Sequence, residues 1–234
     1  LSGWFGVPRE ALERGLEKKF AKKGEGLLEA NRKALAAGLN FATQNPLAQP
    51  RALARPAAPQ PKLLCDGNEM CASAAVFSGC EFFGGYPITP STEVMQILSR
   101  ELPKYGGVVL QAEDEISGVG AAVGASFAGR KSMTATSGPG MSLKTEMLGL
   151  ASLAELPLVL LDVQRGGPST GIPTKPEQSD LFQAAFSAHG DVLRPVLAPT
   201  SVEDTFRLTV EAFNLAEKYQ TPVVILSDQE IAQR

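Results

Sequence analysis

Tyr86-Pro87-Ile88-Thr89-Pro90-Ser91-Thr92 is the stretch of this chain that is least expected to arise by chance. Its prolines restrict the backbone and remove N–H donors, while its tyrosine, threonines and serine provide side-chain oxygens. One interpretation is a proline-constrained turn that follows a strand. The other is a rigid loop that positions a small polar ligand. Both interpretations fit a strand that ends just before Tyr86.

Strand and helix signals alternate on both sides of this loop, from Leu63 to the end of the chain. Apolar runs predict strands over residues 81–85, 107–112, 132–136, 157–163, 192–197 and 222–227. Helical patterns, the first of them opened by the capping pair Asp66 and Glu69, cover 66–79, 92–102, 115–128, 141–153, 180–188 and 202–219. Buried strands that alternate with helices predict an α/β fold, with a parallel sheet covered by helices on both faces.

Four loops then fall at the carboxyl ends of the predicted strands. They are the Tyr86 loop (residues 86–92) and residues 113–115, 137–140 and 164–174. In sheets of this kind the ligand binds at that edge. The candidates for chemistry are therefore expected to gather at one edge of the sheet.

The first 62 residues have a different pattern. Residues 8–40 predict two helices, separated by Gly24 and Gly26, each with one apolar stripe. A helix pair with no sheet to cover is typical of the end of a domain, so residues 1–44 are interpreted as the tail of one. Residues 45–62 hold five prolines among alanine, glutamine and arginine, which predicts an extended linker. The sheet domain is assigned to residues 63–234.

Composition argues against several classes of protein. The formal net charge is -3, which gives no reason to expect nucleic acid as a partner. No apolar run reaches the length of a membrane span, so no membrane partner is expected. Cys65, Cys71 and Cys80 lack CxxC spacing, which argues against a disulfide framework and against a metal or iron–sulfur site on this chain. A reducing cytoplasm fits this cysteine usage.

The Tyr86 loop resembles the YPITPST signature of the 2-oxoacid:ferredoxin oxidoreductases. These are thiamine diphosphate enzymes that cleave 2-oxoacids in the presence of coenzyme A, and the resemblance covers about residues 67–228. It implies the pyrimidine-binding domain of an alpha subunit, most similar to the 2-oxoglutarate type, preceded by the tail of a fused gamma-type domain. The loop residues that it implies at the site are Tyr86 and Thr89 for the substrate, and Pro87 and Ile88 for the cofactor.

Glu113, Asp114 and Glu115 precede a helix that is rich in small residues. Any one of them could simply be an acidic residue that the helix dipole stabilises. The arrangement also resembles the strand-to-helix junction where thiamine diphosphate enzymes place a glutamate that hydrogen-bonds the aminopyrimidine ring. That resemblance selects Glu115 for catalysis and cofactor binding, and Glu113 is the alternative if the register is wrong. A partly buried setting suits a carboxyl that exchanges a proton with the ring nitrogen.

Two further features lie near predicted helix ends. Ser137 and Gly138 open a sharp turn, which is either structural or a helix N-terminus that faces an anion. On the second interpretation both are assigned to the cofactor. His189 is the single histidine, and its position before Gly190 predicts a cap at the C-terminus of a helix rather than a catalytic base.

Arg165 lies between Gln164 and Gly166 in the loop that follows a buried strand. A lone arginine in a loop is most often solvated, but a guanidinium at a strand end can also grip a carboxylate through two hydrogen bonds. The loop resembles a second loop of the same family, which implies that Arg165 binds the carboxylate of the 2-oxoacid and that Thr174 lines the same pocket. Lys175 is a weaker candidate for a second carboxylate.

The resemblance also implies partners. The family places the diphosphate and Mg²⁺ site and the [4Fe-4S] cysteines on a beta subunit, and this sequence shows neither, so activity is expected only with that subunit and with ferredoxin as acceptor. The domain that usually follows the last strand is not seen either. One alternative is a pyruvate- or branched-chain-specific relative. Another is a non-catalytic scaffold subunit, although a scaffold has no need of Thr89, Glu115 and Arg165 together.

Overall fold

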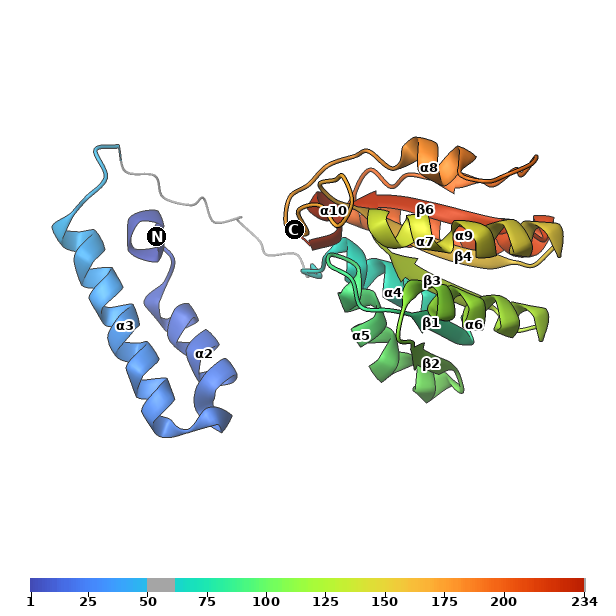
Figure 1. Cartoon of the computed structure of the whole chain (residues 1–234). Coiled ribbons are helices and arrows are strands. Elements are labelled where there is room, and N and C mark those ends of the chain that lie inside the picture. The colour runs from blue at the N-terminus through green and yellow to red at the C-terminus, as the bar shows by residue number, and fades with distance from the viewer. Residues whose placement is uncertain (50–61, 234) are drawn as a thin grey trace. The chain divides into compact units, whose positions relative to one another are not determined.

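The computed structural model of the chain describes residues 1–49 and 62–233. Contacts divide the chain into two units, Leu1–Lys62 and Leu63–Arg234, each with its own helices (Figure 1). The linker expected at 45–62 lies mostly outside the described residues, because its positions 50–61 are not among them. Each unit is therefore considered by itself.

The first unit is a small group of helices. Its elements are α1 (Ser2–Phe5), α2 (Arg9–Phe20), the 3₁₀ helix η1 (Ala21–Lys23) and α3 (Glu25–Gln44). The two expected helices are present, whereas the sequence pattern did not predict α1. Gly3 allows α1 to lie against α3, because a Cβ at this position would lie 2.7 Å from the Ala42 Cβ. Gly24 separates the helices with a φ of 106°, a value that L side chains rarely adopt.

The second unit contains one parallel sheet. Its described residues form six strands in the order β2-β1-β3-β4-β6-β5. The strands are β1 (Phe82–Gly85), β2 (Val108–Gln111), β3 (Ser132–Thr136), β4 (Leu158–Gln164), β5 (Val196–Leu197) and β6 (Pro222–Asp228). The helices are α4 (Gly67–Phe77), α5 (Thr92–Glu101), η2 (Leu102–Tyr105), α6 (Glu115–Phe127), α7 (Gly138–Leu153), α8 (Leu181–Phe186), α9 (Val202–Tyr219) and α10 (Gln229–Gln233). The expected α/β fold is confirmed.

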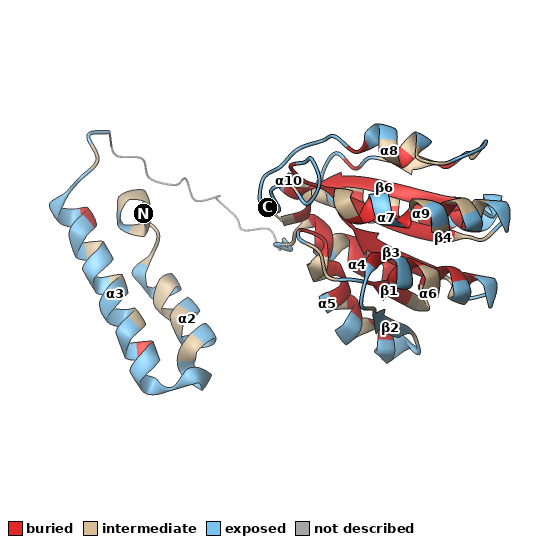
Figure 2. Ribbon diagram, in the orientation of Figure 1, coloured by how far each residue is buried: buried red, intermediate tan, exposed pale blue. Residues whose placement is uncertain are grey.

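Helices cover both faces of this sheet. On one face α4, α5 and α9 pack around a core that includes Phe83, Leu98 and Phe213. On the other face α6, α7 and α8 pack around Val119, Met141 and other apolar side chains. The central strands are buried throughout, as Figure 2 shows, because both of their faces are covered. This explains why they read as nearly continuous apolar runs.

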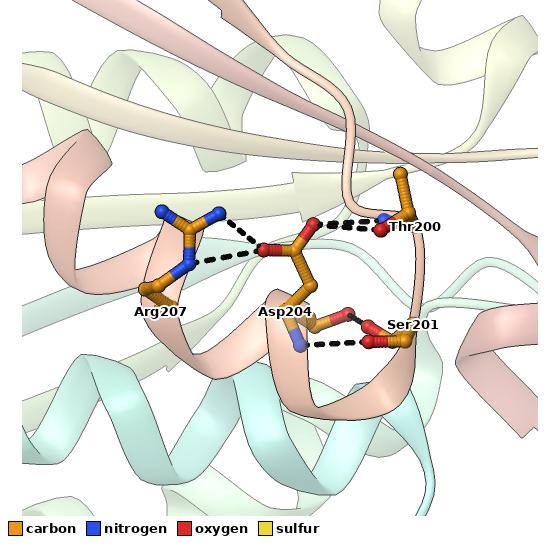
Figure 3. Close-up of polar contacts among 5 residues, drawn as sticks. Thr200, Ser201, Asp204 and Arg207 are labelled. Atoms are coloured by element: carbon orange, nitrogen blue, oxygen red, sulfur yellow. Dashed lines mark hydrogen bonds and ion pairs between the residues drawn. The ribbon is translucent and has the colours of Figure 1, made fainter.

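Side-chain caps mark where α4, α6 and α9 begin. The capping pair expected at α4 is present, since Asp66 and Glu69 form a reciprocal capping box. At α9 the Ser201 hydroxyl accepts a hydrogen bond from the Asp204 N–H, and Asp204 in turn binds Thr200 and Arg207 (Figure 3). These hydrogen bonds satisfy backbone groups that a helix N-terminus leaves unpaired.

Several boundaries differ from the sequence prediction. α7 begins at Gly138, three residues before the predicted start, because a proline in its first turn is compatible with a helix N-terminus. β5 is only Val196–Leu197, since Pro195 has no N–H to donate to the sheet. The prediction that His189 caps a helix is wrong, because α8 ends at Phe186 and its C-cap is Ser187.

Candidate functional site

The expected site residues lie at the carboxyl edge of the sheet. β1 pairs with β2 on one side and with β3 on the other, so the direction in which the chain adds strands reverses between β1 and β3. Ligands of α/β sheets bind at such a reversal. The Tyr86 loop follows β1, the Ser137 turn follows β3, and α6 starts next to them after β2.

The small residues of α6 let this helix lie directly on β1. A Cβ on Gly84 would lie 2.4 Å from the Gly118 main-chain oxygen, and a Cβ on Gly118 would lie 3.0 Å from the Gly85 Cα. The first distance excludes a side chain, and the second would require the backbone of β1 to shift. The glycines thus fix the depth at which the first residue of α6, Glu115, enters the edge of the sheet.

Glu115 is buried at the start of α6, with only 9% of its surface exposed. Its side chain lies against α7, because a Cβ on Gly140 would lie 2.9 Å from the Glu115 Cγ. Its main-chain oxygen accepts a hydrogen bond from the Nζ of Lys144 at 3.0 Å. No residue of the described ranges donates a hydrogen bond to the Glu115 carboxylate. A buried carboxylate that lacks such a partner is suited to a bound ligand.

The other two acidic residues of this junction have different surroundings. Asp114 is the N-cap of α6, and hydrogen bonds from Ser117 hold the pKa of the Asp114 carboxyl below its usual value. Glu113 is exposed to solvent. Of these three acids, only Glu115 combines burial with a carboxylate that has no hydrogen bond, which favours it over Glu113 as the residue that meets a ligand.

Arg165 connects the loop after β4 with the Tyr86 loop. Its Nη1 donates to the main-chain oxygen of Thr89 at 2.6 Å, and its Nη2 donates to that of Thr170 at 2.5 Å. Its Nε is buried without a partner. Burial lowers the pKa of the Arg165 guanidinium, and the nearby charge of Glu115 opposes this effect. Since a guanidinium has five N–H groups, the side chain retains donors for a ligand.

The remaining predicted residues differ in exposure. Tyr86 and Thr89 are exposed, and Pro87 and Ile88 are half-buried in the same loop. Ser137 is fully buried, with a hydroxyl that has no hydrogen-bond partner.

The later part of the loop after β4 is open to solvent. Thr174 and Lys175 are both exposed there. The main-chain oxygen of Lys175 accepts a hydrogen bond from Gly166 at 2.8 Å, which folds the loop back on itself. The structure thus brings Thr89 and Arg165 into contact, whereas it shows no such contact between Thr174 and Arg165.

A hollow of about 400 Å³ lies between the first turn of α7 and the loop after β4. Gly138, Pro139, Arg165, Thr170 and Asp180 are among the residues that line it. A second hollow, of about 880 Å³, lies at the other end of α7 and includes His189. Only the smaller one adjoins the site residues.

Buried acids that the sequence analysis did not select lie beneath this edge. Asp162 on β4 is fully buried, and burial together with the neighbouring Asp180 raises the pKa of its carboxyl well above the usual value. The Asp180 N–H donates to the Gln164 side chain at 2.9 Å. A Cβ on Gly138 would lie 2.9 Å from the Asp180 Oδ2, so this acid supports the start of α7. The signal available in the sequence was an aspartate within the apolar run of β4.

The three cysteines are free thiols. Burial raises the pKa of Cys71 and of Cys80 to about 12, so both remain protonated and unreactive at neutral pH. None of the helices in the described residues is long and apolar enough to cross a membrane.

The fold and this edge define a thiamine diphosphate-binding domain. The family model described as "Pyruvate flavodoxin/ferredoxin oxidoreductase, thiamine diP-bdg" matches residues 73–234, and the chain belongs to this family.

Two of the relatives that the chain resembles are named as KorA subunits. The chain is 52% identical over 163 residues to 2-oxoglutarate synthase subunit KorA of Methanocaldococcus jannaschii, covering 70% of this chain and 44% of that protein. It is 43% identical over 239 residues to 2-oxoglutarate oxidoreductase subunit KorA of Mycobacterium tuberculosis, covering 99% of this chain and 36% of that protein.

A solved structure is similar as well. It is 2-oxoglutarate:ferredoxin oxidoreductase from Magnetococcus marinus with 2-oxoglutarate, coenzyme A and succinyl-CoA bound. The similarity has a TM-score of 0.89 and 48% identity, and it covers 99% of this chain and 41% of that one. The chain therefore spans less than half the length of each of these relatives.

Proposed function

We propose that this chain forms part of a thiamine diphosphate-dependent 2-oxoacid:ferredoxin oxidoreductase that converts 2-oxoglutarate and coenzyme A into succinyl-CoA and CO₂. The observation that carries the proposal is Glu115, a buried carboxylate with no hydrogen-bond donor in the described ranges, placed where the sheet order reverses. The names of the relatives support 2-oxoglutarate as the substrate.

The residues at this edge fit the aminopyrimidine half of the cofactor. Glu115 offers a free carboxylate. Next to it, position 140 has no room for a side chain, because a Cβ on Gly140 would lie 2.0 Å from the Thr136 Oγ1. The buried Ser137 hydroxyl is unpaired and offers a further polar contact. Pro87, Ile88 and Gly138 complete the set that we assign to the cofactor. When bound, thiamine diphosphate supplies the nucleophilic carbon and the electron sink for decarboxylation.

Glu115 has the role of holding a proton at the pyrimidine ring nitrogen. A carboxyl that water hardly reaches exchanges this proton with the ring rather than with solvent. Gly118 and Gly140 pack closely against the sheet and against Glu115, so the carboxyl stays in one place. Such positioning is the main contribution that a protein makes to cofactor chemistry.

Arg165 and Thr89 are assigned to the substrate. The guanidinium retains N–H groups that can grip the carboxylate next to the 2-oxo group, and its bond to the Thr89 main chain holds the two loops together. Tyr86 and Thr174 complete this set. Lys175 is exposed on the loop after β4 and is a candidate to bind the second carboxylate of 2-oxoglutarate.

The remaining parts of the enzyme are assigned to other chains or segments. We assign the diphosphate, Mg²⁺ and the [4Fe-4S] cluster to a beta subunit. Ferredoxin is the electron acceptor and leaves reduced. The helices before residue 45 are assigned to the tail of a gamma-type domain. A cytoplasmic location suits these partners. The relatives are named as subunits, which supports a hetero-oligomer.

The test is to purify the protein with and without its partner subunit. The complex should reduce ferredoxin or a dye only when 2-oxoglutarate and coenzyme A are both present, while the isolated chain should be colourless and inactive. Faster turnover of pyruvate or a branched-chain 2-oxoacid would favour the alternative substrates. Unchanged activity after Glu115→Gln would favour a scaffold role.

A further inference from the structure

Lys144 lies completely out of solvent, although lysine is among the residues least often buried. It comes from the second turn of α7, and its Nζ donates to the main-chain oxygen of Glu115 at 3.0 Å. This hydrogen bond joins two helices across 29 residues of sequence. A buried ammonium group is costly unless it is paired, so its retention calls for an explanation.

Gly140 and Lys144 lie four residues apart on α7 and therefore share one face of that helix. Gly140 lies against the side chain of Glu115, since a Cβ there would lie 3.2 Å from its Oε1. Lys144 binds the main chain of the same residue. One face of α7 thus holds Glu115 at both its carboxylate and its backbone.

The charged groups around Lys144 come from the start of α6. Burial lowers the pKa of Lys144 to about 8, and the charges of Glu115 and Asp114 oppose this effect. From the loop after β4, Arg165 also interacts with Glu115. Glu115 therefore has two cationic neighbours, and the charge of Lys144 changes within the pH range in which enzymes work.

We propose that Lys144 is a positioning residue for the reaction, which fixes the start of α6 through the Glu115 main chain and places its charge beside the Glu115 carboxylate. The proposal rests on the proposed function, in which Glu115 holds a proton at the pyrimidine ring nitrogen of the cofactor. A purely structural lysine would hold the backbone, but its charge would not interact with that of the Glu115 carboxylate.

The first test is a titration of the 234-residue chain that needs neither cofactor nor activity. NMR of the Lys144 side chain, assigned by its absence in Lys144→Met, should show a pKa near 8. In Glu115→Gln this pKa should fall, because the carboxylate that favours the ammonium form is gone. An unchanged Lys144 pKa in Glu115→Gln would overturn the proposal.

The second test uses the complex with the partner subunit. Methionine keeps the length of the lysine side chain without its charge, so Lys144→Met should slow hydrogen–deuterium exchange at the thiazolium C2 about 10- to 100-fold. The variant should also lose any change in rate that the wild type shows near pH 8. Lys131→Met is the matched control, since the Lys131 Nζ also donates to a main-chain oxygen, that of Ser78 at 3.2 Å, and does not contact Glu115.

The two tests separate this proposal from the proposed function. If the wild-type complex exchanges the C2 proton and the Lys144→Met complex exchanges it equally fast, the role of Lys144 is overturned and the proposed function is left intact. A wild-type complex with no 2-oxoacid activity would overturn the function, while the titration would still show whether Lys144 and Glu115 interact. A rate loss of the same size in Lys131→Met would also contradict the proposal.

Discussion

Arg165 donates a hydrogen bond to the main-chain oxygen of Thr89 at 2.6 Å, although 76 residues separate the two along the chain. The same guanidinium binds Thr170 within its own loop. One side chain therefore joins the loops that follow β1 and β4. A substitution of Arg165 should affect both the arrangement of these loops and any carboxylate placed against them.

Arg165→Ala should lower kcat/KM for the 2-oxoacid by tens- to thousands-fold. The loss of a charge-assisted contact in a closed site corresponds to about 2–5 kcal/mol. Arg165→Lys should restore only part of the loss, because an ammonium cannot reproduce the planar fork. Steady-state kinetics of the complex give kcat/KM, and calorimetry gives the affinity for thiamine diphosphate. Full kcat/KM for each 2-oxoacid tested would remove Arg165 from the substrate site, whereas weaker thiamine diphosphate binding would show that the bond to Thr89 also supports the cofactor side of the Tyr86 loop.

Gly140→Ala should disrupt the contact between α7 and Glu115. Its Cβ would lie 2.0 Å from the Thr136 Oγ1 and 2.9 Å from the Glu115 Cγ, so the structure must move to accept it. Overpacking of this kind costs about 1–3 kcal/mol. Denaturant unfolding of the variant measures the cost.

Gly149→Ala is the matched control, because it lies on the same helix and a Cβ there would meet no atom within 4 Å. Alanine favours a helix over glycine by about 0.5–1 kcal/mol, so this variant should be slightly more stable than the wild type. Equal effects of the two substitutions on stability would show that α7 does not pack against Glu115 as described.

Asp162→Asn should change how stability depends on pH. The pKa of Asp162 is raised in the folded state by burial and by Asp180, so the folded protein keeps a proton that the unfolded chain releases. The stability that this group provides is therefore greatest below its ordinary pKa and declines as the pH rises above it. Asparagine does not ionise, so the variant should gain stability relative to the wild type between pH 4 and pH 7, by about 1 kcal/mol or more.

Thermal unfolding at several pH values checks this prediction. The quantity of interest is the difference in stability between the two proteins, because groups that do not interact with Asp162 titrate equally in both; Asp180 is the neighbour whose titration the substitution also changes. A difference that stays constant from pH 4 to pH 7 would contradict the assignment of a protonated Asp162.

Most of the fold could be predicted because the parallel strands are buried on both faces and read as apolar runs. The helix at 202–219 was predicted at its observed bounds, since its apolar stripe is long and Ser201 caps it. The start of α7, the length of β5 and the presence of α10 were not predicted. These depend on local effects of proline and on contacts that form only in the folded chain.

The general location of the candidate site could also be predicted, because the carboxyl ends of parallel strands meet at one edge. The roles of Glu115, Arg165, Thr89 and Thr174 remain predictions. Lys144 could not have been selected, because nothing in its own helix shows that its Nζ reaches the main chain of a residue 29 positions away. Asp180 was likewise hidden, since a long loop carries it back to the end of β4.

Hydrogen–deuterium exchange at the thiazolium C2, measured in the complex for Glu115→Gln and Glu113→Gln, tests the central claim most directly. Glutamine keeps the size of each side chain but cannot exchange the proton. Glu115→Gln should fold normally and abolish exchange and decarboxylation, whereas the exposed Glu113→Gln should leave both unchanged. Exchange at the wild-type rate in Glu115→Gln, together with its loss in Glu113→Gln, would contradict the assignment of Glu115 as the residue that activates the cofactor.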